Sequence, residues 1–259
     1  MNNFRIYGNP PFNIAVIHGG PGAPGEMAPV ARELSLNMGV LEPLQTAVSI
    51  DGQLAELEKI LEKHGNPPMI LVGFSWGAWL SYIFAARYSL LVKKLILIGI
   101  GPFEEKYAAK IMATRLSHLN ANEKKEALSL LSTLNSGGMR DDSFVRFGAL
   151  MDMADAYDPL PHESEVLPCS PDIYQQVWGE AGKLRSSGEL LNLGERVECP
   201  VVAIHGDYDP HPAAGVKEPL ARVIKDFHFI LLEKCGHHPW LERQAKQQFY
   251  DALRREIRL

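Results

Sequence analysis

The sequence predicts an α/β fold in which helices flank a mostly parallel β-sheet and an all-helical segment is inserted between two of the strands. Short apolar runs alternate with amphipathic stretches, which is the order expected of successive β-α-β units. This alternation stops between about residues 102 and 197, where only helical patterns occur. With 46% hydrophobic and 22% charged residues, the chain has the composition of an ordinary globular protein and is long enough to bury a sizeable core.

The strands are predicted from runs rich in Val, Ile, Leu or Phe that do not alternate with polar residues. Such runs are typical of strands that are buried on both faces of a sheet. In chain order they are 13–17, 69–74, 95–100, 201–204 and 227–232, with weaker candidates at 4–7 and within 39–50.

Helices are predicted where apolar residues recur at helical spacing between these strands. In the core they are 51–65, 78–88, 212–224 and a tail from about 239, and in the insertion they are 104–119, 123–134, 142–156 and 172–184. We therefore assign residues 1–101 and 197–259 to the core and 102–196 to a helical cap. A cap between two parallel strands is expected over the carboxyl edge of the sheet, where ligands bind.

Charge and cysteine usage exclude several classes of protein. Lys and Arg total 26 against 31 Asp and Glu, with no block of like charge, which argues against binding of nucleic acid or of an anionic membrane. The three cysteines, Cys169, Cys199 and Cys235, are too widely spaced for a disulfide framework. The first residues lack a basic stretch followed by an apolar run, so we expect a cytoplasmic protein.

One uncharged stretch, Met69–Ala86, is 18 residues long and approaches the length of a membrane span. It contains Gly73, Ser75 and Gly77 in its middle, and two prolines precede it. A strand, a tight turn and a buried helix in succession give the same hydropathy, and we expect that arrangement.

The turn within this stretch, residues 73–77 (GFSWG), carries the strongest chemical signal. A serine on a sharp turn between a strand and a helix is held above the sheet, and flanking glycines let neighbouring chains pack closely against it. The start of the helix also favours developing negative charge. Ser75 is therefore the candidate nucleophile, against the alternative of an ordinary tight turn.

A second signal is the loop 18–22 (HGGPG), which follows the strand 13–17. A glycine-rich loop at this place can point backbone N–H groups at an oxyanion. Pro21 has no N–H, so we expect the donors to be Gly20 and Trp76, the residue after the nucleophile. His18 is expected to tie the loop by hydrogen bonds.

These two segments resemble the α/β-hydrolase superfamily, and within it the branch of proline iminopeptidases, whose elbow also has Trp after the Ser. In that family an acid and then a histidine follow the nucleophile. The family's Gly-x-x-Asp pattern falls on Asp209 in 204–210 (IHGDYDP), and its Gly-His-x-Pro pattern falls on His237 in 235–239 (CGHHP). The resemblance thus implies an α/β-hydrolase fold with a Ser75–Asp209–His237 triad.

In such a triad the histidine takes the serine proton and later gives it to the leaving group, while the aspartate holds the imidazole in the right tautomer. Alternatives stay open for both partners of Ser75. Other candidate acids are Asp207, Glu104 and Glu105, and the other candidate base is His238. Cys235 is expected to be a buried inert thiol.

A metal site is the competing interpretation of the same two segments. Its candidate ligands are His205, Asp207, Asp209, His211, Cys235, His237 and His238. Zinc sites usually show tighter pairs of ligands, and a metal would leave Ser75 and the glycine-rich loop unexplained. We expect no metal and no cofactor.

Ser at the elbow favours acyl transfer to water, since relatives that process halides or epoxides have Asp there. We expect a serine hydrolase acting on a small or medium carboxylic ester. The alternatives are an aminopeptidase of the proline iminopeptidase type, acting on short peptides, and a non-catalytic binding protein on the same fold.

The peptidase would use cap carboxylates to hold the substrate's ammonium group. The candidates are Asp152, Asp155, Glu163, Glu165 and Glu180, the last beside Trp178, and we expect Trp178 and Glu180 to bind substrate. Two departures weaken the transfer of a substrate class from that branch. The region 42–50 lacks the Asp-x-x-Gly-x-Gly-x-Ser run of many relatives, and Phe74 stands where iminopeptidases have a second glycine. The sequence gives no indication of an oligomeric state.

Overall fold

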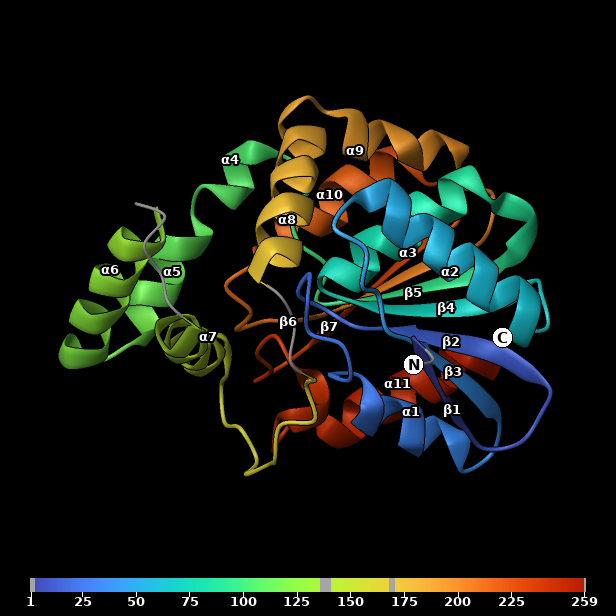
Figure 1. The fold of residues 1–259 in the computed structure, drawn as a ribbon, viewed down its shortest axis with the longest axis horizontal. Coiled ribbons are helices and arrows are strands. Elements are labelled where there is room, and N and C mark those ends of the chain that lie inside the picture. Colours follow the sequence, from blue (N-terminus) through green and yellow to red (C-terminus); the bar gives the residue numbers. More distant parts are fainter. Residues whose placement is uncertain (1–2, 136–140, 168–170, 259) are drawn as a thin grey trace.

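The computed structural model describes residues 3–135, 141–167 and 171–258 (Figure 1). Its centre is a seven-stranded sheet with the order β1-β3-β2-β4-β5-β6-β7. The strands are β1 (Phe4–Tyr7), β2 (Phe12–Ile17), β3 (Gly39–Pro43), β4 (Met69–Phe74), β5 (Val92–Ile98), β6 (Val201–Gly206) and β7 (Phe227–Leu232). Only β1 pairs antiparallel with its neighbour, and the remaining pairs are parallel. The predicted mostly parallel sheet is confirmed.

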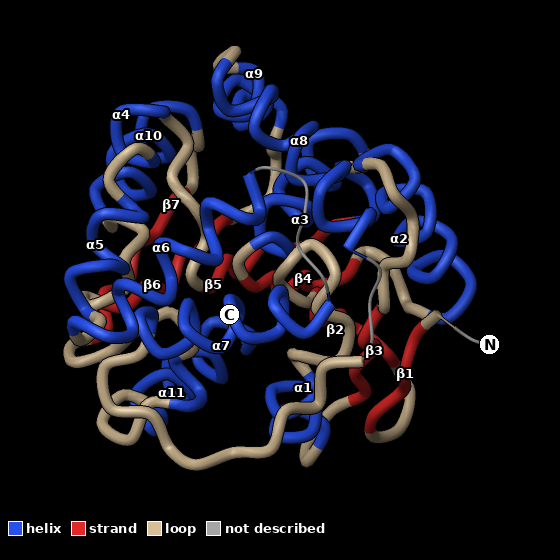
Figure 2. The backbone as a smooth tube through the Cα atoms, turned by 60° about the vertical axis from the view of Figure 1, so that its left-hand side comes forward, coloured by secondary structure: helices blue, strands red, loops and turns tan. Residues whose placement is uncertain are grey.

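Helices cover both faces of this sheet, so the strands lie inside the molecule (Figure 2). One face packs against α2 (Ile50–His64), α3 (Trp76–Arg87) and α10 (Ala214–Val223), and the other against α1 (Ala28–Ser35) and α11 (Lys246–Arg258). β4 lies in the middle, because Gly73 pairs with Ile17 of β2 on one side and Leu97 of β5 on the other. The residue that follows β4 therefore emerges at the centre of the carboxyl edge.

The inserted segment contains helices in the stretches where helices are predicted. They are α4 (Glu105–Ala108), α5 (Ile111–His118), α6 (Ala121–Asn135), α7 (Asp141–Asp155), α8 (Pro171–Ser186) and α9 (Glu189–Asn192), followed by the 3-10 turn η2 (Leu193–Arg196). Helices α5, α6 and α7 stand together at one side of the molecule and enclose a small core that includes Phe147 and Leu150 (Figure 1). Helix α8 instead joins the main core through Ile173, Val177 and Ala181. The division into a core and a cap with boundaries near 102 and 196 stays a prediction.

Three predicted elements differ from the structure, and two short helices, α1 and α9, are not predicted. Helix α1 has only eight residues, too few for a clear helical pattern. The strand predicted at 95–100 ends at Ile98, where Gly99 turns the chain with φ +53°. The single helix predicted over 104–119 is two helices, α4 and α5. The last helix begins at Lys246 and not near Pro239, since Glu242 is extended (φ −83°, ψ 122°) and only a 3-10 turn, η3 (Pro239–Leu241), precedes it.

The uncharged stretch Met69–Ala86 consists of β4, Ser75 and most of α3, as predicted. Within the described ranges, no helix combines the length and the apolar character needed to cross a membrane. Of the three cysteines, Cys199 and Cys235 are free thiols, and Cys169 lies outside the residues that the structure describes.

Candidate active site

Ser75 lies on the turn between β4 and α3, with a backbone conformation that non-glycine residues rarely adopt (φ 50°, ψ −113°). The chain can make this turn because the two flanking glycines leave room for it. A Cβ on Gly73 would lie 2.4 Å from the backbone oxygen of Gly77, and a Cβ on Gly77 would lie 2.3 Å from the backbone oxygen of Ile17. The strained turn and the close packing are those required of a nucleophile elbow.

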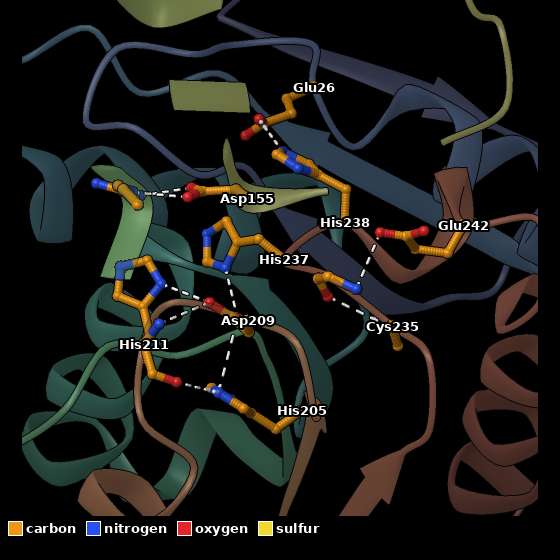
Figure 3. A network of polar contacts seen from close by, with 11 residues as sticks. Glu26, Asp155, His205, Asp209, His211, Cys235, His237, His238 and Glu242 are labelled. Atoms are coloured by element: carbon orange, nitrogen blue, oxygen red, sulfur yellow. Dashed lines mark hydrogen bonds and ion pairs between the residues drawn. The ribbon is translucent and has the colours of Figure 1, made fainter. Parts of the chain in front are cut away.

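Asp209 and His237 are brought together by the loops that follow β6 and β7 (Figure 3). His237 Nδ1 lies 2.7 Å from Asp209 Oδ2, and both side chains are buried. Phe74, the residue before Ser75, packs against His237, with 4.8 Å between the ring centroids. Three segments distant in the sequence therefore meet at one edge of the sheet.

The carboxylate of Asp209 is surrounded by three imidazoles. Besides His237, His211 contacts Asp209 Oδ1 through both its ring Nδ1 (2.7 Å) and its backbone N–H (2.9 Å). The ring of His205 lies 3.6 Å from Asp209 Oδ2. Burial alone would raise the pKa of Asp209, but its electrostatic interactions and hydrogen bonds with His237, His211 and His205 outweigh this effect and lower the pKa well below its ordinary value. Asp209 is thus an anion throughout the neutral range.

The alternative acids are engaged elsewhere. Asp207 accepts a hydrogen bond from the backbone N–H of Cys235 at 3.1 Å and is exposed. Glu104 pairs with Lys106 and Arg222, and Glu105 pairs with Arg185. Among the candidate acids, Asp209 contacts the ring of His237.

His238, the alternative base, forms an ion pair with Glu26, whose Oε1 lies 3.1 Å from His238 Nε2 (Figure 3). Burial by itself lowers the pKa of His238, but the hydrogen bond and the charge of Glu26 outweigh this effect and raise it to about 9. His238 is therefore protonated at neutral pH. A protonated imidazole has no basic nitrogen left and cannot take a proton from a serine.

The two candidate oxyanion donors lie at the ends of β2 and β4. Gly20 adopts φ +103° in the loop after β2, and Trp76 is the first residue of α3, where backbone N–H groups have no helical acceptor. In the part of the chain that the structure describes, neither N–H donates to a protein acceptor. Both groups can therefore donate to a ligand.

His18 and Glu26 hold the glycine-rich loop in its shape. His18 donates from Nδ1 to the Gly19 carbonyl (2.8 Å) and accepts at Nε2 from the Gln45 N–H (3.2 Å), which requires a neutral ring. Burial lowers the pKa of His18, which agrees with this state. Glu26 Oε2 accepts the Gly19 N–H at 3.0 Å.

Trp178 and Glu180, the residues of the inserted segment that are expected to bind substrate, lie against α2 and α3. The ring centroid of Trp178 lies 6.1 Å from that of Trp76 and 5.6 Å from that of Trp79. The carboxylate of Glu180 accepts a hydrogen bond from the Ile50 N–H at 2.8 Å, at the start of α2. Glu180 is therefore occupied at a helix N-terminus, where negative charge is favourable.

A cavity of about 960 Å³ adjoins the candidate site. Its wall includes Glu26 and His238, and it extends between α1, α7 and the segment 156–166. Asp152 and Glu163 line it as well, whereas the carboxylate of Glu165 at its rim is paired with Arg32. The cavity therefore reaches the residue next to His237.

The residues predicted as metal ligands do not all gather in one place. Of the described residues, Asp209, His211 and His237 have donor atoms within 4.8 Å of one another, while Cys235 and His238 point to other partners. Both ring nitrogens that face Asp209 already make hydrogen bonds of 2.7 Å to it. Burial raises the pKa of the Cys235 thiol, which disfavours the thiolate that a metal needs. The cluster fits a hydrogen-bonded acid and base better than a metal centre.

Sequence reasoning missed three members of this network. Glu26 and Arg115 have no motif around them, and their roles depend on contacts with residues far away in the chain. His211 was within reach, because it follows Asp209 by two residues, but the pattern points to a metal ligand and not to a partner of the carboxylate.

The chain is similar to known proteins in sequence and in fold. A family model described as alpha/beta hydrolase fold matches residues 21–244. A monoacylglycerol lipase, ABHD6 of Bos taurus, is 26% identical over 208 residues, covering 77% of this chain and 58% of that protein. The chain thus spans less than two thirds of the length of this curated relative.

Among solved structures, VinJ superposes with a TM-score of 0.72 at 16% identity, covering 98% of this chain and 94% of that one. A proline iminopeptidase of Mycobacterium smegmatis gives a TM-score of 0.65 at 15% identity, with 98% and 93% covered. At these identities the two structures support the fold. The family model matches most of the chain, so the protein belongs to the alpha/beta hydrolase family.

Proposed function

We propose that the protein is a serine hydrolase that cleaves a small or medium carboxylic ester through Ser75, His237 and Asp209. The observation that carries this proposal is the buried contact of 2.7 Å between Asp209 and His237 beside the strained turn at Ser75. A carboxylate that holds Nδ1–H leaves Nε2 of the same ring as the basic nitrogen, which is the arrangement of a triad.

In the first half of the reaction, Ser75 Oγ attacks the ester carbonyl while His237 Nε2 takes the hydroxyl proton. The carbonyl oxygen becomes an oxyanion and accepts hydrogen bonds from the N–H groups of Gly20 and Trp76, each worth about 3 kcal/mol in such sites. The bond to the alcohol oxygen then breaks, and His237 gives its proton to the departing alcohol. An ester between Ser75 and the acyl group remains.

In the second half, a water molecule attacks this acyl-enzyme and loses its proton to His237. The new tetrahedral intermediate collapses, the carboxylic acid leaves, and the proton returns to Ser75 Oγ. Asp209 stays ionised in both halves, because its pKa lies well below the ordinary value. Its charge stabilises the imidazolium that forms twice in each cycle.

An ester is preferred to a peptide because the carboxylates expected to hold an ammonium group are mostly occupied. Asp155 pairs with Arg115 and Glu165 with Arg32. Glu180 accepts the N–H of Ile50. The name of the curated relative, a monoacylglycerol lipase, points the same way.

The test is covalent labelling of the purified protein with a fluorophosphonate, combined with a panel of p-nitrophenyl esters and aminoacyl naphthylamides. Labelling and ester hydrolysis are expected in the wild type and in Ser129→Ala, a matched change of an exposed serine on α6, and both are expected to vanish in Ser75→Ala. Labelling that persists in Ser75→Ala rejects this nucleophile. Higher activity on proline naphthylamide than on any ester supports the peptidase, and a wild type that neither labels nor hydrolyses supports the binding protein.

A further inference from the structure

The triad carboxylate has a second histidine partner besides the base. His211 lies two residues after Asp209 and approaches Asp209 Oδ1, while His237 approaches Asp209 Oδ2 (Figure 3). The two imidazoles thus divide the carboxylate between them, one on each oxygen, at the same distance of 2.7 Å. The ring of His211 also lies against the ring of His237, with 4.6 Å between centroids and an interplanar angle of 30°.

We propose that His211 is a positioning residue, which holds one oxygen of Asp209 and one face of the His237 ring so that the other oxygen remains aimed at His237. This inference rests on the proposed triad. It assigns to His211 a proton on Nδ1, since a carboxylate oxygen can only accept.

His211 is itself held in place. Its backbone N–H donates to Asp209 Oδ1 at 2.9 Å, and its carbonyl accepts a hydrogen bond from His205 Nε2 at 2.7 Å. Its side chain is only 11% exposed. The backbone of His211 is thus held by two hydrogen bonds, and its ring by the contact of Nδ1 with Asp209 and by the ring of His237. A side chain held in this way can restrict the rotation of the carboxylate that it contacts.

Burial favours a neutral ring at His211. Burial lowers the pKa of His211, and the charge of Asp209 opposes but does not overcome this effect. The other groups that face it are His237 from the loop after β7, His205 from β6 and Arg115 from α5, and the charge of Arg115 is balanced by Asp155 of α7. A neutral His211 donates a hydrogen bond to Asp209 and leaves the carboxylate ionised. This hydrogen bond weakens the effect of the carboxylate charge on His237.

Two substitutions separate the role of the hydrogen-bond donor from that of the ring that packs against His237. In His211→Phe the aromatic face remains against His237 but the donor is lost. In His211→Asn the amide nitrogen occupies the position of Nδ1 and the ring is lost. We expect His211→Phe to lower kcat/KM for an ester about 10-fold to 100-fold. The acid limb of the pH profile of kcat/KM for His211→Phe is expected to move to higher pH by roughly half a unit. Without the hydrogen bond from His211, the carboxylate of Asp209 stabilises the protonated ring of His237 more strongly.

His211→Asn is expected to keep the acid limb of the wild type. A residue that only fills space predicts lower activity at every pH in both variants, with no displacement of the acid limb in either. An unmoved acid limb in His211→Phe therefore overturns the proposal, and so does an equal displacement in both variants.

A measurement on the unmodified protein does not depend on how the variants fold. Long-range ¹H–¹⁵N NMR of protein labelled with ¹⁵N-histidine distinguishes the two neutral tautomers of each ring. We expect His211 to carry its proton on Nδ1 at neutral pH, and a proton on Nε2 overturns the proposal. Failure of the triad itself is seen separately, as fluorophosphonate labelling that survives Ser75→Ala.

Discussion

Glu26 joins His238 to Gly19 through a single carboxylate. Oε1 lies 3.1 Å from His238 Nε2, and Oε2 accepts the Gly19 N–H at 3.0 Å. One of these partners directly precedes the candidate oxyanion donor Gly20, and the other directly follows the candidate base His237. The two loops come from opposite ends of the chain, so this carboxylate fixes the glycine-rich loop relative to His237 and His238.

Replacement of Glu26 by Gln is expected to change how stability depends on pH. The pKa of His238 is raised to about 9, against about 6.5 in an unfolded chain. The stabilisation from the pair is therefore fully present below about pH 6.5, down to the range where Glu26 takes up a proton, and is lost as the pH rises through about 9. On the order of 3 kcal/mol is at stake.

Urea unfolding at several pH values measures this effect. The wild type is expected to have a larger free energy of unfolding than Glu26→Gln. This difference is expected to be largest at pH 6 and to become small at pH 10. Glu165→Gln, which removes an exposed carboxylate from Arg32, is the control and is expected to leave the pH dependence unchanged. A wild-type advantage that stays constant across this window contradicts the assignment.

Gly77 is expected to tolerate no side chain. An alanine Cβ there would lie 2.3 Å from the Ile17 carbonyl oxygen and 2.4 Å from that of His18, and both are backbone atoms that cannot move without shifting β2. We expect Gly77→Ala to cost about 3 kcal/mol or more. At Gly179 in α8 a Cβ meets nothing within 4 Å, so Gly179→Ala is expected to gain about 0.5–1 kcal/mol. Thermal unfolding of both variants checks the contrast, and equal destabilisation would show that the packing around the elbow is not the cause.

Asp209 and Asp207 provide a matched pair for the identity of the triad acid. Asp209→Asn leaves the side chain in place but favours the wrong tautomer of His237, and we expect kcat to fall about 10³-fold to 10⁴-fold. Asp207→Asn keeps an oxygen that can accept the Cys235 N–H, and we expect a change within a few-fold. Steady-state kinetics with one p-nitrophenyl ester decides between them. A larger loss at position 207 than at 209 would reverse the assignment.

The inner strands β4, β5 and β6 could be predicted from the sequence because they are buried on both faces. The edge strand β7 is only partly buried, but its residues are still mostly apolar. β4 and β7 match their predicted residues, since their apolar runs are bounded by proline, glycine or charged residues. Helix α1 escaped prediction because its apolar residues are few and interrupted by Arg32 and Glu33. The start of α11 was misplaced because Leu241 and Ala245 continue its periodicity, although the chain there is held by Glu242, which accepts the N–H groups of three residues elsewhere in the chain.

In the candidate site, too, some residues could be predicted from local sequence patterns and others could not. Ser75, Asp209 and His237 each lie in a local pattern, because each needs a particular turn at the end of a strand. Glu26, His211 and Arg115 act through contacts between segments, and no local pattern encodes them. Glu180 illustrates the converse: an acid beside Trp178 suggests a binding site, but its carboxylate meets the start of α2, a contact that only the folded chain defines.

The ion pair of Arg115 and Asp155 links the inserted helices to His237, the candidate base. The guanidinium of Arg115 in α5 donates to both oxygens of Asp155 in α7, at 2.6 and 2.5 Å, and Asp155 is buried. The carbonyl of Asp155 accepts the backbone N–H of His237 at 2.8 Å. Removal of Arg115 therefore leaves a buried carboxylate unpaired on the residue whose carbonyl accepts the backbone N–H of His237.

We expect Arg115→Leu to destabilise the protein by about 3–5 kcal/mol and to lower kcat/KM for an ester. Asp155→Asn in the same chain removes the unpaired charge, so the double variant is expected to recover part of the stability lost by Arg115→Leu. The control is the pair of Arg146 and Glu126, which joins α7 to α6 with side chains 48% and 41% exposed. Because water screens such a pair, Arg146→Leu is expected to cost at most about 1 kcal/mol. Urea unfolding of the four proteins in the double-mutant cycle measures the coupling, and strictly additive losses would mean that the two residues do not stabilise each other.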